Sequence, residues 1–337
     1  MTMKTMFVDD TRSLLTEGNG TPESEPAKNR LSNAAGGNGR LLSATAPFQE
    51  VSREISGREF QQFQQLIYRE AGIWLSPAKV ALLTGRLARR LRHHGLKTFT
   101  AYYALVSESA EERVQMLDAI STNETHFFRE AQHFELLESE IFPQWVRDVD
   151  EGRRNRKIRV WSAGCSTGQE PYSLAMMLLA HFPAAAGWEI EIIATDLSTR
   201  VLSVAKKGIW PAAKGASEIP IEYLKAFMLK GVGEQTGQIK AAPELRSLVK
   251  FHRVNLNSSA YPFVGTFDLI FCRNVLIYFD ERSQDSIVRR IVSFLSPSSY
   301  FFVGHAESLH RMGDILSTYV PTVYRSARKT FQGGKEK

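Results

Sequence analysis

Residues Ile158 to Pro171 read IRVWSAGCSTGQEP, an apolar run that leads into a loop containing two glycines. The run Ile158–Trp161 is typical of a buried strand. Glycines in the loop after the first strand of an open sheet let a ligand approach the backbone, and such ligands lie at the carboxyl ends of the strands. The loop around Gly164 therefore predicts a binding site for a small molecule.

Strands and helices alternate on the C-terminal side of this loop, which predicts an α/β fold with a Rossmann-like parallel sheet covered on both faces. The sheet domain is expected over 151–328, with a small inserted β subdomain at about 214–253 and a flexible tail over 329–337. The further expected strands are Ile190–Ala194, Phe267–Cys272 and Tyr300–Val303, and the expected helices are Tyr172–Phe182, Thr199–Lys207, Ile221–Leu229 and Arg282–Leu295.

The residues before the sheet domain divide into three parts. Residues 1–49 are rich in Gly, Ser, Asn and Thr and are expected to be a disordered tail. Residues 50–121 predict a small all-α domain, because Ser56 with Glu59 forms a capping-box pattern and Ser76 precedes a first-turn proline. Residues 122–150 are expected to be a linker that contributes to the ligand site.

The loop is a poor phosphate site, since it lacks both the G-x-G-x-x-G and the G-x-x-x-x-G-K-[ST] patterns. Glu170 at its end would repel phosphate and attract an amino group. Asp196 ends the second strand, where an acid can accept hydrogen bonds from ribose hydroxyls. Together these two acids favour S-adenosylmethionine over NAD, although each could instead cap a helix.

The net charge of the chain is 42 − 36 = +6, and residues 71–107 alone contain six basic residues and no acid. In this segment Arg86, Arg89, Arg90 and His93 recur at i, i+3, i+4 and i+7, on a different helix face from a leucine stripe. The pattern predicts contact with an acidic partner. A solvated face and a phosphate-binding face for nucleic acid are the alternatives, the second weakened by the lack of interleaved exposed aromatics.

Other patterns exclude several classes of protein. No run of 18 apolar residues and no signal peptide are seen, which predicts a cytoplasmic protein without direct membrane insertion. The two cysteines, Cys165 and Cys272, are far apart in sequence, which fits a reducing compartment, and Cys165 is expected to be a small filler. The pairs His126 with His133 and His305 with His310 lack acidic or thiolate partners at helical spacing, so no metal is expected.

Three further segments resemble the signature blocks of the CheR chemotaxis receptor methyltransferases. They are TNETHFFRE at 122–130, FCRNVLIYF at 271–279 and GHAESL at 304–309, in the family's order, and with the glycine loop they span about 52–326. The second block also differs from the N-P-P-Y pattern of enzymes that methylate base amines. Gln169 stands where many relatives have an acid, and the N-terminal tail is longer than usual.

The resemblance implies an enzyme that transfers the methyl group of S-adenosylmethionine to glutamate carboxylates on the cytoplasmic helices of chemoreceptors. It implies Arg129 and Tyr278 as the substrate-side residues. It also implies a second contact, between the inserted subdomain and a C-terminal receptor peptide, and recruitment to receptor arrays. The cofactor contacts it implies are Asn123, Thr125, Arg129, Gly164, Glu170, Asp196, Asn255, Leu256, Arg273 and Asn274.

A glutamate nucleophile explains why the sequence contains no recognisable catalytic base. A glutamate side chain has an ordinary pKa near 4.3 and is already ionised at neutral pH. Alignment of the reactants then becomes the main task of the protein. The chain is expected to act as a monomer, and the alternatives are an RNA or other methyltransferase and a signalling module that binds S-adenosylmethionine without turnover.

Overall fold

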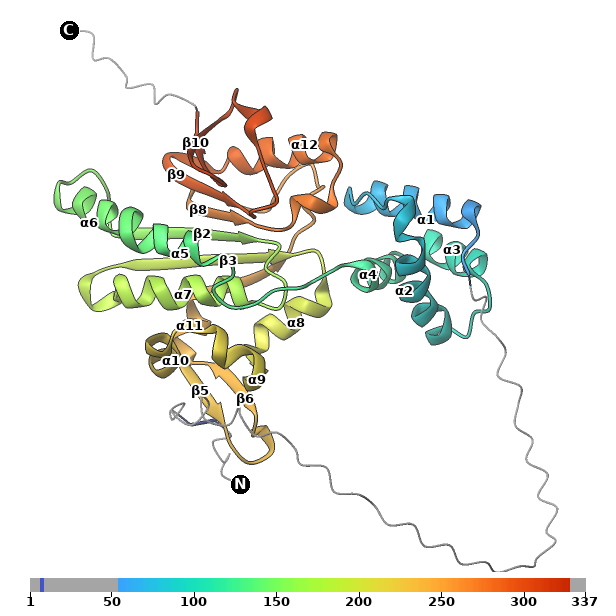
Figure 1. The fold of residues 1–337 in the computed structure, drawn as a ribbon, viewed down its shortest axis with the longest axis horizontal. Coiled ribbons are helices and arrows are strands. Elements are labelled where there is room, and N and C mark those ends of the chain that lie inside the picture. The colour runs from blue at the N-terminus through green and yellow to red at the C-terminus, as the bar shows by residue number, and fades with distance from the viewer. Residues whose placement is uncertain (1–6, 9–53, 328–337) are drawn as a thin grey trace, which may run out of the picture.

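The computed structural model describes residues 7–8 and 54–327, which form two packed domains (Figure 1). The N-terminal domain consists of four helices, each begun where a side chain or a proline supports the first turn. Ser56 forms the predicted capping box with Glu59, Thr98 and Ser109 cap the third and fourth helices, and Pro77 opens a 3-10 turn before the second. These helices are α1 Gly57–Ala71, α2 Val80–His93, α3 Phe99–Glu108 and α4 Ala110–Ile120.

The C-terminal domain is built on a seven-stranded sheet of order β10-β11-β9-β8-β2-β3-β7. The five strands from β9 to β7 are parallel, whereas β11 runs antiparallel to β9 and pairs with β10 as a hairpin. The α/β class with a largely parallel sheet is confirmed, and the hairpin was not predicted. The strands are β2 Lys157–Ala163, β3 Glu189–Asp196, β7 Val249–Arg253, β8 Phe267–Cys272, β9 Leu295–Val303, β10 Leu316–Val320 and β11 Val323–Ser326.

Both faces of the sheet are buried, because successive residues of a strand point to opposite sides. Val160 packs in one cluster with helices before and after β2, while its neighbour Trp161 packs in the other cluster with α12. On β9, Phe302 packs in the same cluster as Val160, and Phe301 packs in the same cluster as Trp161. The helices are α5 Ala131–Leu136, α6 Phe142–Asp150, α7 Gln169–His181, α8 Thr199–Lys207, α11 Pro243–Leu248 and α12 Glu281–Val292.

Two of the expected boundaries need correction. The segment 122–150, predicted as a linker, contains α5, a π-helical turn at Leu137–Ile141 and α6, and it buries Phe134 and Trp145 against the sheet. The predicted insertion at 214–253 begins and ends too late. Strand β4 at Ile209–Pro211 already pairs within the small sheet of the insertion, whereas Val249–Arg253 is strand β7 and pairs with β3 in the main sheet. Buried apolar residues in these segments belong to the main core, a fact that local sequence does not reveal.

The inserted subdomain has its own small sheet of order β1-β5-β6-β4, with helices α9 Ala212–Gly215 and α10 Ile221–Phe227. Its strands β4 Ile209–Pro211, β5 Met228–Gly231 and β6 Gln238–Ala241 come from the insertion. Strand β1, Phe7–Val8, comes from the segment predicted to be a disordered tail, so that expectation is wrong for these two residues. The rest of the predicted tail 1–49, and the tail 329–337, lie outside the described residues.

Candidate active site between the helical and sheet domains

A cavity of about 350 Å³ lies between the two domains, at the carboxyl ends of the central strands. Its volume is within the range of small-molecule sites. All ten predicted cofactor residues line it, and so does Tyr278. The helical domain contributes part of the wall, including Ala71, Lys79 and Leu82, which the sequence analysis did not single out.

The glycine loop is shaped by two conformations that favour glycine. Gly164 has φ +82°, and a Cβ atom there would lie 2.3 Å from Cγ2 of Val275. Gly168 has φ +99° and immediately precedes α7. The amides of Gly164 and Cys165 donate to the carbonyl of Thr195 at 2.7 and 2.8 Å, which ties the loop to the end of β3. The loop therefore approaches the cavity with its backbone, as predicted.

Glu170 lies in the first turn of α7 and lines the cavity. The Ser162 hydroxyl donates to its carboxylate at 2.7 Å, and Nε of Arg273 lies 3.8 Å from it. Burial raises the pKa of Glu170, and Arg273 and Ser162 only partly oppose this effect. A cationic group entering the cavity would favour the ionised form of this carboxylate.

Asp196 ends β3 on the other side of the glycine loop. Its carboxylate accepts from the amides of Ser166 and Ser198, each at 2.9 Å. Burial raises its pKa as well. The side chain that caps α8 is Ser198, so the alternative role of Asp196 as a helix cap does not apply. Its carboxylate lines the cavity, where hydroxyl groups of a ribose would find an acceptor.

Arg129 and Tyr278 come from different segments and both line the cavity. Nη1 of Arg129 donates to the carbonyl of Glu124 at 3.1 Å. The flanking residues Phe128 and Glu130 have φ of +50° and +58°, a backbone conformation that non-glycine residues seldom adopt. Such strain is concentrated at functional sites. Burial raises the pKa of the half-buried Tyr278, so its hydroxyl is protonated at neutral pH and can donate a hydrogen bond.

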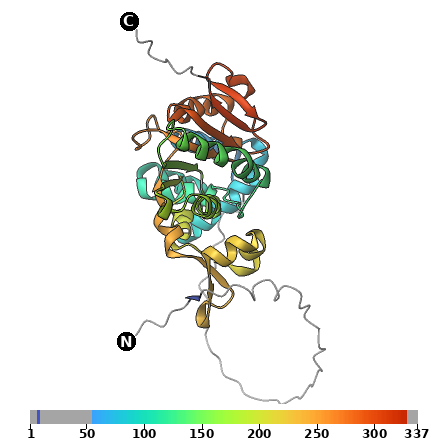
Figure 2. The same ribbon diagram turned by 90° about the vertical axis from the view of Figure 1, so that its left-hand side faces the viewer.

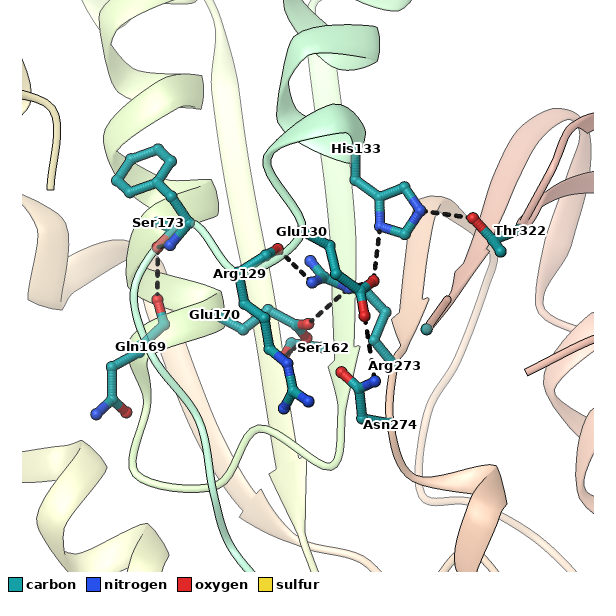
Figure 3. A network of polar contacts seen from close by, with 12 residues as sticks. Arg129, Glu130, His133, Ser162, Gln169, Glu170, Ser173, Arg273, Asn274 and Thr322 are labelled. Carbon is teal, nitrogen blue, oxygen red and sulfur yellow. Dashed lines mark hydrogen bonds and ion pairs between the residues drawn. The ribbon is translucent and has the colours of Figure 1, made fainter. Parts of the chain in front are cut away.

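Arg273 lies at the centre of a buried polar network that is drawn in Figure 3. Its side chain is only 1% exposed and lies between the carboxylates of Glu170 and Glu130, with Nε 3.3 Å from Oε2 of Glu130. Its Nη2 donates to the carbonyl of Arg129. Burial opposes the ionisation of Glu130, but Arg273 and the amide of His305 outweigh it and lower the pKa of Glu130.

Glu130 was quoted in the first signature block but not predicted as a site residue. Its Oε1 accepts from Nδ2 of Asn274 and from the amide of His305, both at 3.2 Å. Glu307 of the third block also holds the backbone near the cavity. It accepts hydrogen bonds from the amides of Asn274 at 2.8 Å and Gly304 at 2.6 Å. Acids that hold backbone amides near a cavity leave no pattern of their own in a single sequence.

The histidines also differ from expectation. His133 and His305 both approach Oε2 of Glu130, at 3.5 and 3.9 Å, so they do have a carboxylate partner. Their ligand atoms and that of Glu130 lie within 4.8 Å of one another. The guanidinium of Arg273 already lies against the same oxygen. The prediction that no metal is needed stays a prediction.

The predicted basic face of α2 is only partly exposed. Arg86 donates to the carbonyl of Ile120 and to the hydroxyl of Thr122, and Arg90 forms a fork of bonds to Glu112 at 2.8 and 2.5 Å. Arg89 and His93 are exposed. Arg86 and Arg90 are only partly exposed, because α4 packs against α2, but both line the same surface depression as Arg89. The contact of these four residues with an acidic partner stays a prediction.

A sheet of this order, with a glycine loop after its first strand, a carboxylate just beyond that loop and a second carboxylate at the end of the next strand, defines a Rossmann-like S-adenosylmethionine-dependent methyltransferase with an additional helical domain. Two family models match the chain: "CheR methyltransferase, all-alpha domain" over residues 58–121 and "CheR methyltransferase, SAM binding domain" over residues 123–324. The chain belongs to the CheR methyltransferase family.

Two curated relatives are similar in sequence to this chain, and each match covers most of this chain and most of the relative. A chemotaxis protein methyltransferase of Borreliella burgdorferi is 36% identical over 274 residues, which cover 80% of this chain and 95% of the relative. A chemotaxis protein methyltransferase of Escherichia coli is 37% identical over 273 residues, covering 80% and 91%. Within residues 7–8 and 54–327, no helix is both long and apolar enough to cross a membrane.

Proposed function

We propose that this enzyme methylates glutamate side chains of chemoreceptors and forms glutamate methyl esters that tune receptor signalling. The observation that carries the proposal is one cavity in which Glu170 and Asp196 lie beside Arg129 and Tyr278. The acids suit a cofactor with an amino group and a ribose, and the arginine and tyrosine suit a substrate carboxylate. Relatives named chemotaxis protein methyltransferases supply the substrate class.

The residues of the cavity fit S-adenosylmethionine, which supplies a methyl group bonded to a cationic sulfur. Glu170 would receive the amino group and Asp196 the ribose hydroxyls. Nη1 of Arg273 is buried and has no hydrogen-bond partner among the described residues, so it is a free donor for the cofactor's carboxylate. Nδ2 of Asn123 is also buried, has no partner within residues 7–8 and 54–327, and offers a second donor.

Arg129 would hold the substrate carboxylate through its fork of donors, and Tyr278 would add one hydrogen bond without adding charge. No residue needs to remove a proton, because the glutamate is already ionised at neutral pH. Orientation can save roughly 7 to 11 kcal/mol of the barrier. Lys79, whose Nζ lies 5.8 Å from the centre of the Tyr278 ring, adds positive charge on the side where the carboxylate would enter.

The receptor would approach the helical domain with its acidic methylation helix. Arg89 and His93 are the exposed members of the basic face on α2, and Arg200 of α8 lines the same surface depression as Arg89. Charge complementarity of this kind raises the rate of encounter and fixes register. We further propose a monomeric enzyme without a metal, recruited to receptor arrays through a C-terminal receptor peptide at the inserted subdomain.

The test is incubation of the protein with radiolabelled S-adenosylmethionine and receptor-containing membranes from its own source. The proposal predicts label on the receptors that is released as methanol in base, because glutamate methyl esters hydrolyse readily. It also predicts that Arg129→Ala abolishes the label without abolishing the binding of S-adenosylhomocysteine. Base-stable label, or label transferred to RNA in the same extract, would contradict the proposal.

A further inference from the structure

The two described residues of the N-terminal segment lie on the inserted subdomain, far along the chain from their partners. Strand β1, Phe7–Val8, pairs with β5, and β5 pairs on its other side with β6. Figures 1 and 2 both show this N-terminal strand beside β5, away from the helical domain. Without β1, β5 would be an edge strand of this small sheet.

The contacts of β1 are few but specific. Phe7 lies opposite Gly231 and Val8 lies opposite Lys230, in antiparallel register. The Phe7 ring lies 5.0 Å from Nζ of Lys240 in a cation–π contact. Because alternate residues of a strand share a face and Lys240 pairs with Leu229, the side chains of Phe7 and Lys240 are on the same side of the sheet as Gly231.

Gly231 is buried, because the backbone of the turn between β5 and β6 lies against it. A larger residue cannot replace the glycine, because a Cβ atom there would lie 1.9 Å from the carbonyl oxygen of Gln235 in the turn between β5 and β6. The contact that Phe7 makes on this face is with Lys240. Lys240 favours an extended segment that places an aromatic ring within reach of its ammonium group.

A strand of two residues makes too few contacts to pair firmly as a free peptide. Val8 is 38% exposed, and only two residue pairs connect β1 to β5. Covalent attachment raises the effective concentration of such a segment to the millimolar range, which allows a weak contact to form within the chain. An edge strand with open N–H and C=O groups otherwise accepts any suitable extended segment.

We propose that the edge of β5 is a strand-accepting site that the chain fills with its own residues Phe7 and Val8. The N-terminus thus acts as a built-in ligand of the inserted subdomain. Another extended segment with an aromatic followed by an aliphatic residue can pair with β5 only after β1 has left. The pairing of β1 with β5 does not depend on the proposed function. The expectation that β1 competes with a receptor peptide for this edge does rest on the proposed function.

Hydrogen exchange tests the occupancy directly. The full chain and a chain lacking residues 1–10 are compared by mass spectrometry for amide exchange over β5, with β8 in the main sheet as an internal control. The proposal predicts faster exchange in the shortened chain over β5, Met228–Gly231, at the amides that face β1 in the full chain, and unchanged exchange in β8. Equal exchange over β5 in the two chains would overturn it.

Peptide binding tests the ligand pattern. A fluorescent peptide of residues 1–12 is titrated into both chains, with a Phe7→Ala peptide as the matched control. We expect the shortened chain to bind the native peptide at least about tenfold more tightly than the full chain, and more tightly than it binds the control. Full-length Phe7→Ala provides a variant without truncation, and its edge should also admit the peptide.

Three outcomes would overturn the proposal. The first is no binding of the native peptide to the shortened or the Phe7→Ala chain even at millimolar concentration. The second is equal binding to these two chains and to the native full chain, and the third is loss of β5 protection when the full chain is diluted. The last result would mean that β1 comes from a second copy. Receptor methylation measured in parallel keeps the proposed function separate, since it can succeed or fail whatever happens at this edge.

Discussion

At the scale of single residues, Arg273 pairs with two partly buried carboxylates at once. Glu130 and Glu170 both lie within 4 Å of its guanidinium, and the Arg273 side chain is only 1% exposed. Burying a charge is costly unless it is paired, so the arginine and the two acids depend on one another. When all three groups are ionised, the set has one excess negative charge, which suits a cationic cofactor.

Replacement of Glu170 by glutamine should weaken the binding of S-adenosylhomocysteine by roughly 10- to 100-fold at neutral pH, because the amino group loses its countercharge. Burial raises the pKa of Glu170, so the native enzyme should lose affinity as the pH falls through that raised value. The variant should show a flatter profile. Isothermal titration from pH 5 to 8 measures both effects, with the exposed Glu189→Gln as control; a parallel fall in affinity in native and Glu170→Gln proteins would contradict this role.

Replacement of Glu130 by glutamine tests a positioning role. The charge of Glu130 raises the pKa of Glu170, while Arg273 lowers it. Without that charge, the pKa of Glu170 falls, and the acid side of the binding profile should move to lower pH even though Arg273 is less firmly held. Glu130→Asp, which keeps the charge, should restore the native midpoint. Loss of affinity with an unmoved midpoint would indicate a merely structural residue.

At the scale of elements, Glu112 joins α2, α3 and α4. It accepts bonds from Arg90 of α2 and, at 2.7 Å, from Tyr102 of α3. Burial raises the pKa of Glu112, but bonds from Arg90, Tyr102 and His94 outweigh it and bring the pKa to about 2. Residue spacing placed Arg90 on a different face of α2 from the leucines, but it could not reveal that Glu112 of α4 is its partner.

Replacement of Glu112 by glutamine should lower the free energy of unfolding by roughly 2 to 4 kcal/mol at pH 7, because Arg90 loses its partner. The folded pKa lies below the ordinary value of 4.5, so the stabilisation is present above that value and is lost as the pH falls toward about 2. Urea unfolding should therefore show a smaller gap between native and variant at pH 3 than at pH 7. Glu111→Gln, an exposed neighbour, should show no gap.

Charge reversal at Arg89 tests the basic face of α2. We expect Arg89→Glu to slow receptor methylation about 3- to 10-fold at low salt, with the difference shrinking at high salt as screening increases. Arg58→Glu is the matched control, since Arg58 is also exposed but lies on α1. Equal rates for the Arg89 and Arg58 variants at low salt would remove the basic face from substrate recognition.

At the scale of the whole molecule, the cavity exists because the two domains are joined by specific bonds. Asp118 of α4 accepts from the hydroxyl of Thr199 at the start of α8 at 2.5 Å, and Tyr68 of α1 donates to Asp280 at 2.9 Å. The amide of Trp74 donates to the carbonyl of Tyr278 at 2.9 Å. The helical domain is thus held against the sheet domain where the substrate carboxylate would enter.

Sequence patterns predicted the central strands, because buried strands have clear local signals. The ten residues assigned to the cofactor from the loop and the family's signature blocks all line the cavity, and their contacts with the cofactor stay a prediction. Sequence patterns did not predict β10 and β11, whose residues alternate too weakly, nor the strand formed by Phe7 and Val8 in a polar segment. Lys79 and Glu130 were also missed as site residues. Their contacts join positions far apart in the chain, such as Glu130 and Arg273. A single sequence does not show which distant positions come together in the fold.

The most direct measurement is to find which atom of the substrate receives the methyl group. A purified signalling fragment of a chemoreceptor is incubated with the enzyme and S-adenosylmethionine, and the product is mapped by tandem mass spectrometry. We expect one added methylene mass on glutamate side chains, removed by mild base. Methyl groups on lysine or arginine nitrogens, or an unmodified fragment alongside enzyme that binds S-adenosylhomocysteine, would contradict it.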